Sequence, residues 1–315
     1  MKFDVVCGNP SYNNDLYIDF ILKSHNISKN CHLWVTPAKW QFKSSNKQFR
    51  EVVLPYMSDV VYYPDEKEVF KSINVGGGIA YYLVDKKDKH DKKYISTRFI
   101  KNNLFTSNSY RNFEFHLCDF VNDLIKHIRG INDLSVADIF DLSADHYGLS
   151  GIPLSASKED GIQVFGGNQY GVLESVGYIK RSDIHKNNKD IDKYKLTLNV
   201  AIRGGGSSAD SNGTYIGMST LNILEPNMCT KDHYANLVCD ADINYLKSIK
   251  SYLETKLINF IFVFSLCGDT LSNKEVWRYI PLVHFNKIYN DESVYEMFNI
   301  DDKTKSVIER TIRKR

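Results

Sequence analysis

The feature that most constrains the fold is the segment Phe3–Tyr12, where a short apolar run ends abruptly in turn residues. Val5, Val6 and Cys7 follow one another without a polar break, and Gly8 then leads into the tetrapeptide Asn9-Pro10-Ser11-Tyr12. Such a run is typical of a buried strand in a parallel sheet, with a loop at its carboxyl end. Open α/β sheets place their ligands at these ends. The segment therefore predicts an α/β fold with a candidate binding loop after its first strand.

The residue types of this loop suit a planar base that carries an amino group. Pro10 fixes its own φ and keeps Asn9 out of the helical region, so the amide is held in an extended loop. The Asn9 side-chain carbonyl and a main-chain carbonyl are two acceptors for an exocyclic amino group. The ring of Tyr12 can stack on the base. The alternative is an ordinary turn after a strand, in which Asn, Pro and Ser are common.

The residues that follow alternate between helix and strand patterns, as expected for an α/β sheet. A triple glycine precedes the last apolar run, and its conformational freedom would let the backbone pass close to a ligand. It is not a dinucleotide-binding fingerprint, because no G-x-G-x-x-G opens a helix there. The expected elements are helices at Leu16–Lys23 and Gln48–Leu54 and strands at His32–Thr36, Val60–Tyr63 and Val75–Val84.

The character of the chain changes after about residue 115, where short strands alternate with glycine-rich turns. Basic residues stand near aromatic ones there, which suits a surface that neutralises phosphates and contacts bases. The alternative is an ordinary β-rich domain with surface lysines. Ala241–Phe262 has apolar residues at helical spacing and predicts one long amphipathic helix. The candidate DNA-binding residues are Lys180, Arg181, Lys186 and Lys195.

Composition limits the class of protein. A net charge of +2 over 315 residues means that any nucleic-acid surface must come from local clustering of basic residues. The six cysteines form no Cys-x-x-Cys pair and have no histidine at metal spacing, so they predict reduced thiols and no metal site. Lys2 and Phe3 lead directly into the first strand, and the apolar run Leu257–Cys267 is too short to span a bilayer. We expect a cytoplasmic protein without membrane contact.

The tetrapeptide and its context resemble the catalytic motif of amino-methyltransferases, usually Asn-Pro-Pro-Tyr, with Ser11 where the second proline is usual. The chain is similar to adenine-specific (N6) DNA methyltransferases of restriction-modification systems with a fused target-recognition domain, the type IIG-like methylases. The resemblance continues through Thr36–Trp40, the triple glycine and Tyr178–Asp183 to a glycine-rich loop that opens at Arg203. It also covers Glu225–Thr230 and the ending Trp277–Leu282.

This resemblance implies a partial Rossmann-like methyltransferase sheet followed by an α+β target-recognition domain, with 1–95 catalytic and 96–315 DNA-recognising. Asn9, Pro10 and Tyr12 would hold a flipped adenine while S-adenosylmethionine supplies the methyl group. Double-stranded DNA would be the substrate. The implied target-base pocket also contains Lys39, Trp40 and Gly77, with the alternative that Trp40 packs on the core. Arg203 joins the implied DNA-binding residues.

One part of the resembled family is missing from this sequence. The family binds S-adenosylmethionine through a glycine-rich turn after an earlier strand, and no such strand, turn and helix unit is found here. The chain therefore predicts either a methyltransferase that works with a cofactor-binding or restriction subunit, or an inactive DNA-binding remnant. A third reading is a restriction endonuclease, because Pro64-Asp65 with Asp85-Lys86-Lys87 loosely fits a nuclease metal site.

Overall fold

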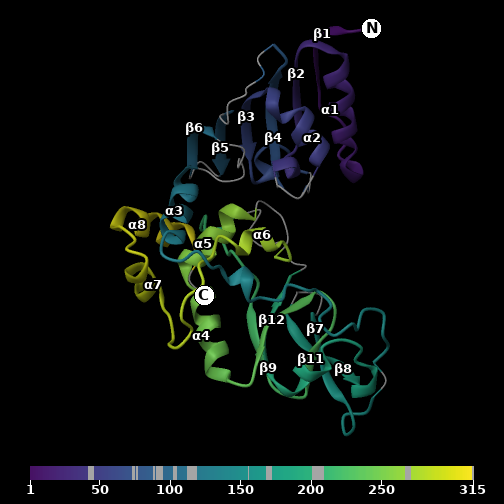
Figure 1. Ribbon diagram of the computed structural model, residues 1–315, viewed down its shortest axis with the longest axis vertical. Coiled ribbons are helices and arrows are strands. Elements are labelled where there is room, and N and C mark those ends of the chain that lie inside the picture. The colour runs from purple at the N-terminus through teal and green to yellow at the C-terminus, as the bar shows by residue number, and fades with distance from the viewer. Residues whose placement is uncertain are drawn as a thin grey trace. The chain divides into compact units, whose positions relative to one another are not determined.

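The computed structural model describes residues 1–313 except 42–45, 73–74, 76, 88, 90–94, 102–104, 112–118, 155, 168–171, 201–208 and 267–270. The chain divides into two compact units, Met1–Asp123 and Leu124–Arg315. Both contain helices and strands, so the protein is mixed α/β as predicted (Figure 1). No helix of the described part is long and apolar enough to cross a membrane.

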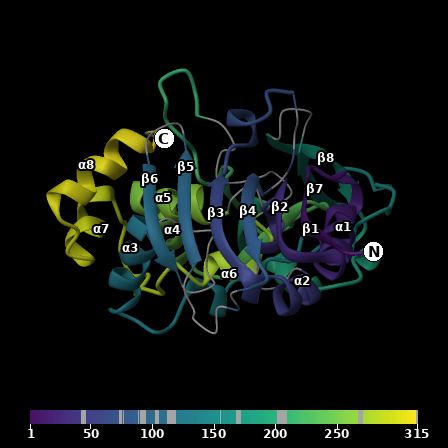
Figure 2. The ribbon, with the colours of Figure 1, turned by 90° about the horizontal axis from the view of Figure 1, so that it is seen from above.

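The first unit is built on a six-stranded sheet with the order β1-β2-β4-β3-β5-β6, which Figure 2 shows along one row. β1 is parallel to β2 and β3 is parallel to β5, whereas β4 lies between β2 and β3 and runs against both. β6 is antiparallel to β5. The strands are β1 Phe3–Gly8, β2 Ser28–Pro37, β3 Met57–Tyr63, β4 Ile79–Asp85, β5 Ile95–Lys101 and β6 Phe105–Arg111.

The predicted boundary between residues 95 and 96 falls at the start of β5. Because β5 and β6 pair into the first sheet, that sheet continues to Arg111. The assignment of a catalytic part and a recognition part to the chain stays a prediction, as does the Rossmann-like character of the sheet.

One face of this sheet is covered by two helices, α1 Leu16–Ile27 and α2 Lys47–Val52. Beneath α1, His25 Nδ1 lies 3.1 Å from His32 Nε2, and Trp34 donates to His32 Nδ1 at 2.7 Å. All three of these side chains are buried. Since strand side chains alternate between faces, the even-numbered residues of β2 and β4 build this core.

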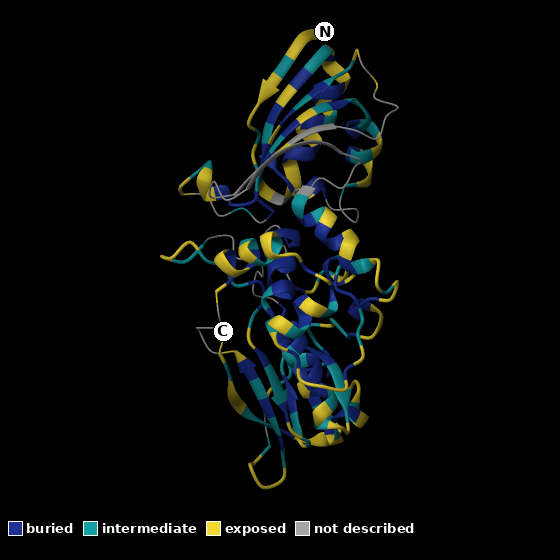
Figure 3. Ribbon diagram, turned by 90° about the vertical axis from the view of Figure 1, so that its left-hand side faces the viewer, coloured by how far each residue is buried: buried dark blue, intermediate teal, exposed yellow. Residues whose placement is uncertain are grey.

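The opposite face of the same strands is left open over β1, β2, β3 and β4. The β1 residues on this face are exposed although they are apolar, and Figure 3 shows the exposed strand at the N-terminus. β1 is also the edge strand of the sheet, so among the described residues no strand pairs with its outer side. Exposed apolar residues on this face are Phe3 at 46%, Val5 at 53%, Leu33 at 43% and Tyr81 at 36%.

The described residues of the second unit form two three-stranded sheets, in the orders β10-β9-β12 and β11-β7-β8. Its strands are β7 Ile162–Gly167, β8 Leu173–Ile179, β9 Tyr194–Asn199, β10 Leu221–Leu224, β11 Met228–Thr230 and β12 Tyr234–Asp240. α3 Asp119–Arg129 crosses the boundary between the units. The other helices are α4 Ile243–Leu253, α5 Lys256–Ser265, α6 Lys274–Trp277, α7 Asp291–Met297 and α8 Asp302–Thr311.

The predicted long helix Ala241–Phe262 is in fact two helices, α4 and α5. Thr255 adopts an extended conformation between them, and its hydroxyl donates to the carbonyl of Tyr252. α5 is buried from Leu257 to Ser265, so its apolar residues surround the helix instead of forming one stripe.

Candidate functional site

The carboxyl ends of β1, β2 and β3 lie at one edge of the first sheet, together with the start of β4. The predicted residues Asn9, Lys39 and Gly77 lie in the loops of this edge. Ala38 N donates to Gly78 O at 3.0 Å, and a Cβ atom on Gly77 would approach Lys39 Cγ to 2.8 Å. The fold therefore brings these loops together, as the strand pattern predicts. Their role in holding a base stays a prediction.

The Asn9 loop is held from within by Tyr12, whose hydroxyl donates to Asn9 Oδ1 at 2.5 Å and lies 3.5 Å from Val35 O. Asn9 is exposed, whereas Pro10 and Tyr12 are half-buried. Burial, with the nearby Tyr81, raises the pKa of Tyr12 to about 12, so its hydroxyl stays protonated at neutral pH. Since a carbonyl oxygen has two lone pairs, Asn9 Oδ1 can accept a second hydrogen bond from a ligand.

Beside Asn9 the open face of the sheet forms a shallow apolar hollow of about 490 Å³. This volume is in the range of small-molecule sites. The hollow begins at the carboxyl end of β1 and extends over β2, β4 and β3, so Asn9 stands at its rim. The lining residues are Cys7, Gly8, Asn9, Leu33, Trp34, Val35, Asp59, Val61, Tyr81, Tyr82 and Leu83.

Trp40, the predicted ring of the base pocket, occupies the core. It is fully buried and packs against Phe49 and Tyr82, with ring centroids 5.3 Å apart in both pairs. It is not among the residues that line the hollow. The sequence allows Trp40 either to line the base pocket or to pack on the core, and its position in the structure agrees with packing on the core.

Two residues of the hollow are not singled out by the sequence patterns. Tyr81 is exposed on the open face and close enough to Tyr12 to affect its pKa, and Asp59 adds a carboxylate to the lining. Alternation along β4 could have identified Tyr81, because Tyr82 faces the core and its neighbour must face the other way.

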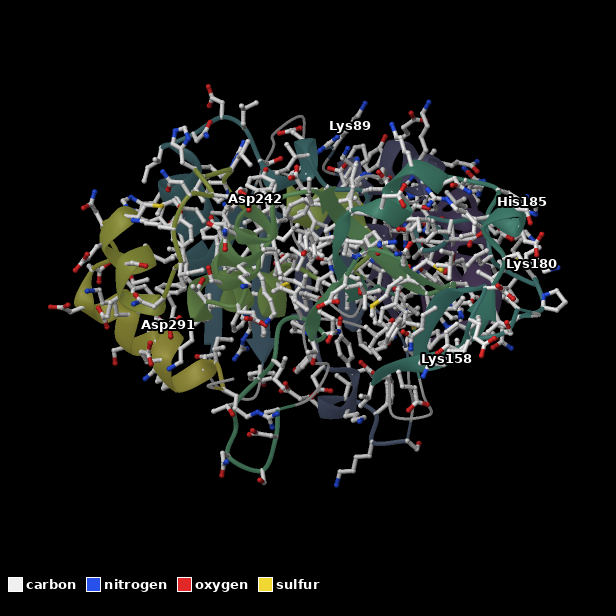
Figure 4. The ribbon with its side chains drawn as sticks, turned by 90° about the horizontal axis from the view of Figure 1, so that it is seen from below. Lys89, Lys158, Lys180, His185, Asp242 and Asp291 are labelled. Atoms are coloured by element: carbon white, nitrogen blue, oxygen red, sulfur yellow. The ribbon has the colours of Figure 1, made fainter. Side chains whose placement is uncertain are left out.

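In the second unit, three of the predicted DNA-binding residues lie at the surface. Lys180 and Lys186 are exposed, and Figure 4 shows Lys180 and His185 projecting from the same segment. Arg181 is also exposed, but both of its terminal nitrogens donate to Asp192, each at 2.6 Å. A phosphate would have to compete with this carboxylate for the guanidinium group. Arg203 lies outside the described residues.

Lys195 is placed differently from what its sequence context predicts. It lies on the central strand β9, is fully buried, and its Nζ donates to the carbonyls of Ile191 and Glu225 at 2.8 and 2.9 Å. Burial lowers its pKa to about 8. A side chain enclosed in this way holds two loop carbonyls and does not reach a DNA phosphate.

The nuclease pattern does not form one metal site. β3 and β4 are antiparallel, and Tyr63 pairs with Ile79, so Asp65 and Asp85 lie at opposite ends of this strand pair. At about 3.4 Å per residue the two ends are roughly 20 Å apart. Lys86 Nζ instead donates to the carbonyls of His25 and Ser28 at 2.6 and 2.8 Å.

No protein-family model matches the chain. The chain is similar to an uncharacterised adenine-specific methylase from Mycoplasma pneumoniae, with 26% identity over 122 residues. The matched part is 32% of this chain and 28% of that protein, so the chain spans less than a third of the relative's length. A match of this extent supports a methylase-like relationship at most.

Proposed function

We propose that this protein supplies the base-holding loop and the DNA-recognition part of an adenine-specific DNA methyltransferase of the restriction-modification type. The observation that carries the proposal is the position of Asn9. Its carbonyl stands at the carboxyl end of the parallel strand β1, at the rim of an apolar hollow. The similarity to a protein described as an adenine-specific methylase supports the same activity.

In this role the chain's own residues position the target base. The Asn9 side-chain oxygen and the Pro10 carbonyl accept the two hydrogens of the adenine amino group, which draws the nitrogen lone pair out of conjugation with the ring. Tyr12 already donates to Asn9 and so orients the amide. Catalysis of this kind depends on positioning, because the amine itself is the nucleophile. The flipped base stacks on an aromatic ring, with Tyr12 and the exposed Tyr81 as candidates.

S-adenosylmethionine, when bound, supplies the electrophilic methyl group. The described residues around the hollow offer apolar surface and the Asp59 carboxylate. Gly8 is the last residue of β1, and the connection Asn9–Asp15 from β1 to α1 contains no glycine, so it is not the glycine-rich turn that the resembled family uses for this cofactor. We therefore assign the cofactor to a further polypeptide segment or partner that docks beside β1 and over the open face.

The test is methyl incorporation from labelled S-adenosylmethionine into duplex DNA, with the protein alone and with added cofactor-binding chains. Asn9→Ala should lower incorporation by about 10²- to 10³-fold, the typical loss when one positioned polar group is removed from an active site. DNA binding, measured by fluorescence anisotropy, should stay within a factor of two. Asn13→Ala, an exposed asparagine of the following 3-10 helix Asn13–Asp15, is the matched control.

Two outcomes would contradict the proposal. Equal methylation by the wild type and Asn9→Ala would remove the role given to Asn9. If the protein binds DNA but binds no S-adenosylmethionine, alone or with an added chain, the result would instead favour the alternative of an inactive DNA-binding remnant.

A further inference from the structure

A second candidate site lies in the second unit, where side chains from three separate segments meet. His146 follows the 3-10 helix Val136–Asp138, Asp190 belongs to the 3-10 helix Asn188–Asp192, and Cys239 lies on β12. Their ligand-type atoms all lie within 4.8 Å of one another. His146 and Asp190 are buried, and Cys239 is half-buried. The spacing of these residues in the sequence gives no sign of this cluster.

The distances within the cluster are close to those around a tetrahedral zinc ion. His146 Nε2 lies 3.3 Å from Asp190 Oδ2 and 4.0 Å from Cys239 Sγ. Zinc bond lengths at tetrahedral angles place nitrogen and oxygen ligands roughly 3.3 Å apart, and nitrogen and sulfur ligands roughly 3.6 Å apart. The distance between His146 and Asp190 already fits this geometry, and Cys239 Sγ would have to move closer to the other two ligand atoms.

The hydrogen bonds around His146 leave Nε2 facing a carboxylate. His146 Nδ1 lies 2.7 Å from Asp141 Oδ2 and can reach this carboxylate only by donating to it. In neutral histidine Nε2 then carries a lone pair, and it faces the anionic Asp190 oxygen at 3.3 Å. A metal cation between the two atoms would be bound by both of them. A carboxylate on the second nitrogen is also the usual support of a zinc-binding histidine.

The adjacent Tyr147 gives an independent indication of a ligand. Its side chain is fully buried, and its hydroxyl has no hydrogen-bond partner among the described residues. The ring packs edge-on against His146, with ring centroids 4.7 Å apart. A buried hydroxyl without a partner costs about 1–3 kcal/mol, and water on a metal ion is one group that would satisfy it.

We propose that His146, Asp190 and Cys239 bind one Zn²⁺ ion, with a water molecule in the fourth position near the Tyr147 hydroxyl. Histidine nitrogen, carboxylate oxygen and thiolate sulfur together are a donor set that suits zinc. The Asp190 carboxylate and the Cys239 thiolate balance the charge of the ion. Lys193 donates to the other oxygen of this carboxylate, Asp190 Oδ1, at 2.8 Å, and so leaves Oδ2 for the ion. The nearby Lys195 directs its ammonium group to two carbonyls instead. The ion would join the loop, the 3-10 helix and β12 within the second unit.

The experiment uses the full chain with Zn²⁺ and Co²⁺ as probes. After removal of metal with a chelator and dialysis against a small excess of Zn²⁺, elemental analysis should find one ion per chain. Co²⁺ should give a thiolate-to-cobalt charge-transfer band in the near ultraviolet, which reports sulfur coordination without any substitution. A protein that binds less than a tenth of an equivalent of zinc, or cobalt without this band, would overturn the proposal.

Variants separate the metal site from a hydrogen-bonded histidine network. Cys239→Ala should abolish the cobalt band and weaken zinc binding by at least 100-fold, whereas Cys31→Ala, at another half-buried strand cysteine, should change neither. Asp141→Asn should keep the band and weaken zinc binding by about 10- to 100-fold. Zinc should raise the melting temperature of the wild type and leave that of Cys239→Ala unchanged. Equal zinc binding by wild type and Cys239→Ala would refute the assignment.

Discussion

Two buried histidines on the helix-covered side of the first sheet make the stability of the first unit dependent on pH. His25 and His32 contact each other, and Trp34 donates to His32 Nδ1. Burial lowers the pKa of His25 to about 4, with Lys86 as a smaller cause. Burial, then His25 and Lys86, lowers that of His32 to about 3. Both rings are therefore neutral in the folded protein at pH 5.

The size of the effect follows from proton linkage. Between pH 6.5 and pH 4 the unfolded chain binds protons at these histidines and the folded protein does not, so stability falls as the pH falls. At pH 5, protonation of the unfolded state with its ordinary pKa of 6.5 amounts to about 2 kcal/mol per histidine. We expect the first unit to lose about 4 kcal/mol of unfolding free energy between pH 7.5 and pH 5.

Urea unfolding followed by tryptophan fluorescence measures this loss, because Trp34 and Trp40 lie in the first unit and Trp34 contacts His32. His32→Gln retains an acceptor for Trp34 but cannot titrate, so its loss should fall to about 2 kcal/mol. His185→Gln, at an exposed histidine of the second unit, is the control and should behave as the wild type. A loss below about 1 kcal/mol in the wild type, or an unchanged loss in His32→Gln, would refute the reasoning.

Four further predictions concern single residues. Tyr12→Phe keeps the ring and should retain methylation and DNA binding within about tenfold. Tyr12→Ala loses base stacking and should weaken binding of the flipped base by about 1–3 kcal/mol. Equal effects of the two substitutions would contradict the stacking role. Gly78→Ala should destabilise the first unit by roughly 2–3 kcal/mol in urea unfolding, because φ is +69° and the added Cβ would lie 2.3 Å from Tyr63 O. Lys195→Met removes one donor from the carbonyls of Ile191 and Glu225 and should destabilise the second unit by about 1–3 kcal/mol without changing the salt dependence of DNA binding. Lys180→Met should leave the stability of the second unit unchanged and should lower the slope of log K for DNA binding against log salt by about one.

The helices and strands of the first unit up to β4 could be predicted because their apolar periods are regular and their boundaries carry turn residues, whereas β5 and β6 are not among the predicted strands. The same reasoning fails for Ala241–Phe262, where an unbroken apolar period hides the break at Thr255. That break depends on the extended backbone of Thr255 and on Asn259, whose side-chain amide donates to the carbonyls of Leu253 and Thr255 at 3.1 and 2.9 Å. The spacing of apolar residues in the sequence does not reveal contacts of this kind.

The candidate sites also include residues that a local sequence pattern predicts and residues that it does not. Asn9 could be proposed as a candidate because the pattern that points to it lies within one short segment of the chain. The cluster of His146, Asp190 and Cys239 could not, because its members are separated by more than forty residues and meet only in the folded unit. Lys195 shows the opposite error. A lysine between polar and aromatic neighbours suggests a surface, but the central position of β9 places its side chain in the interior.

The open face of the first sheet connects these observations to the proposed function. Apolar residues on both faces of β1 and β2 predict strands that are buried on both sides, and helices cover only one side in the described part of the chain. An apolar face next to a free sheet edge is an unusual surface for a protein in water. Because the hollow beside Asn9 belongs to this face, whatever covers it would also enclose the amino group of a bound base. Exclusion of water strengthens the hydrogen bonds that Asn9 offers. A methyltransferase whose cofactor part docks on this face would therefore complete its active site in the same step that buries the apolar strands.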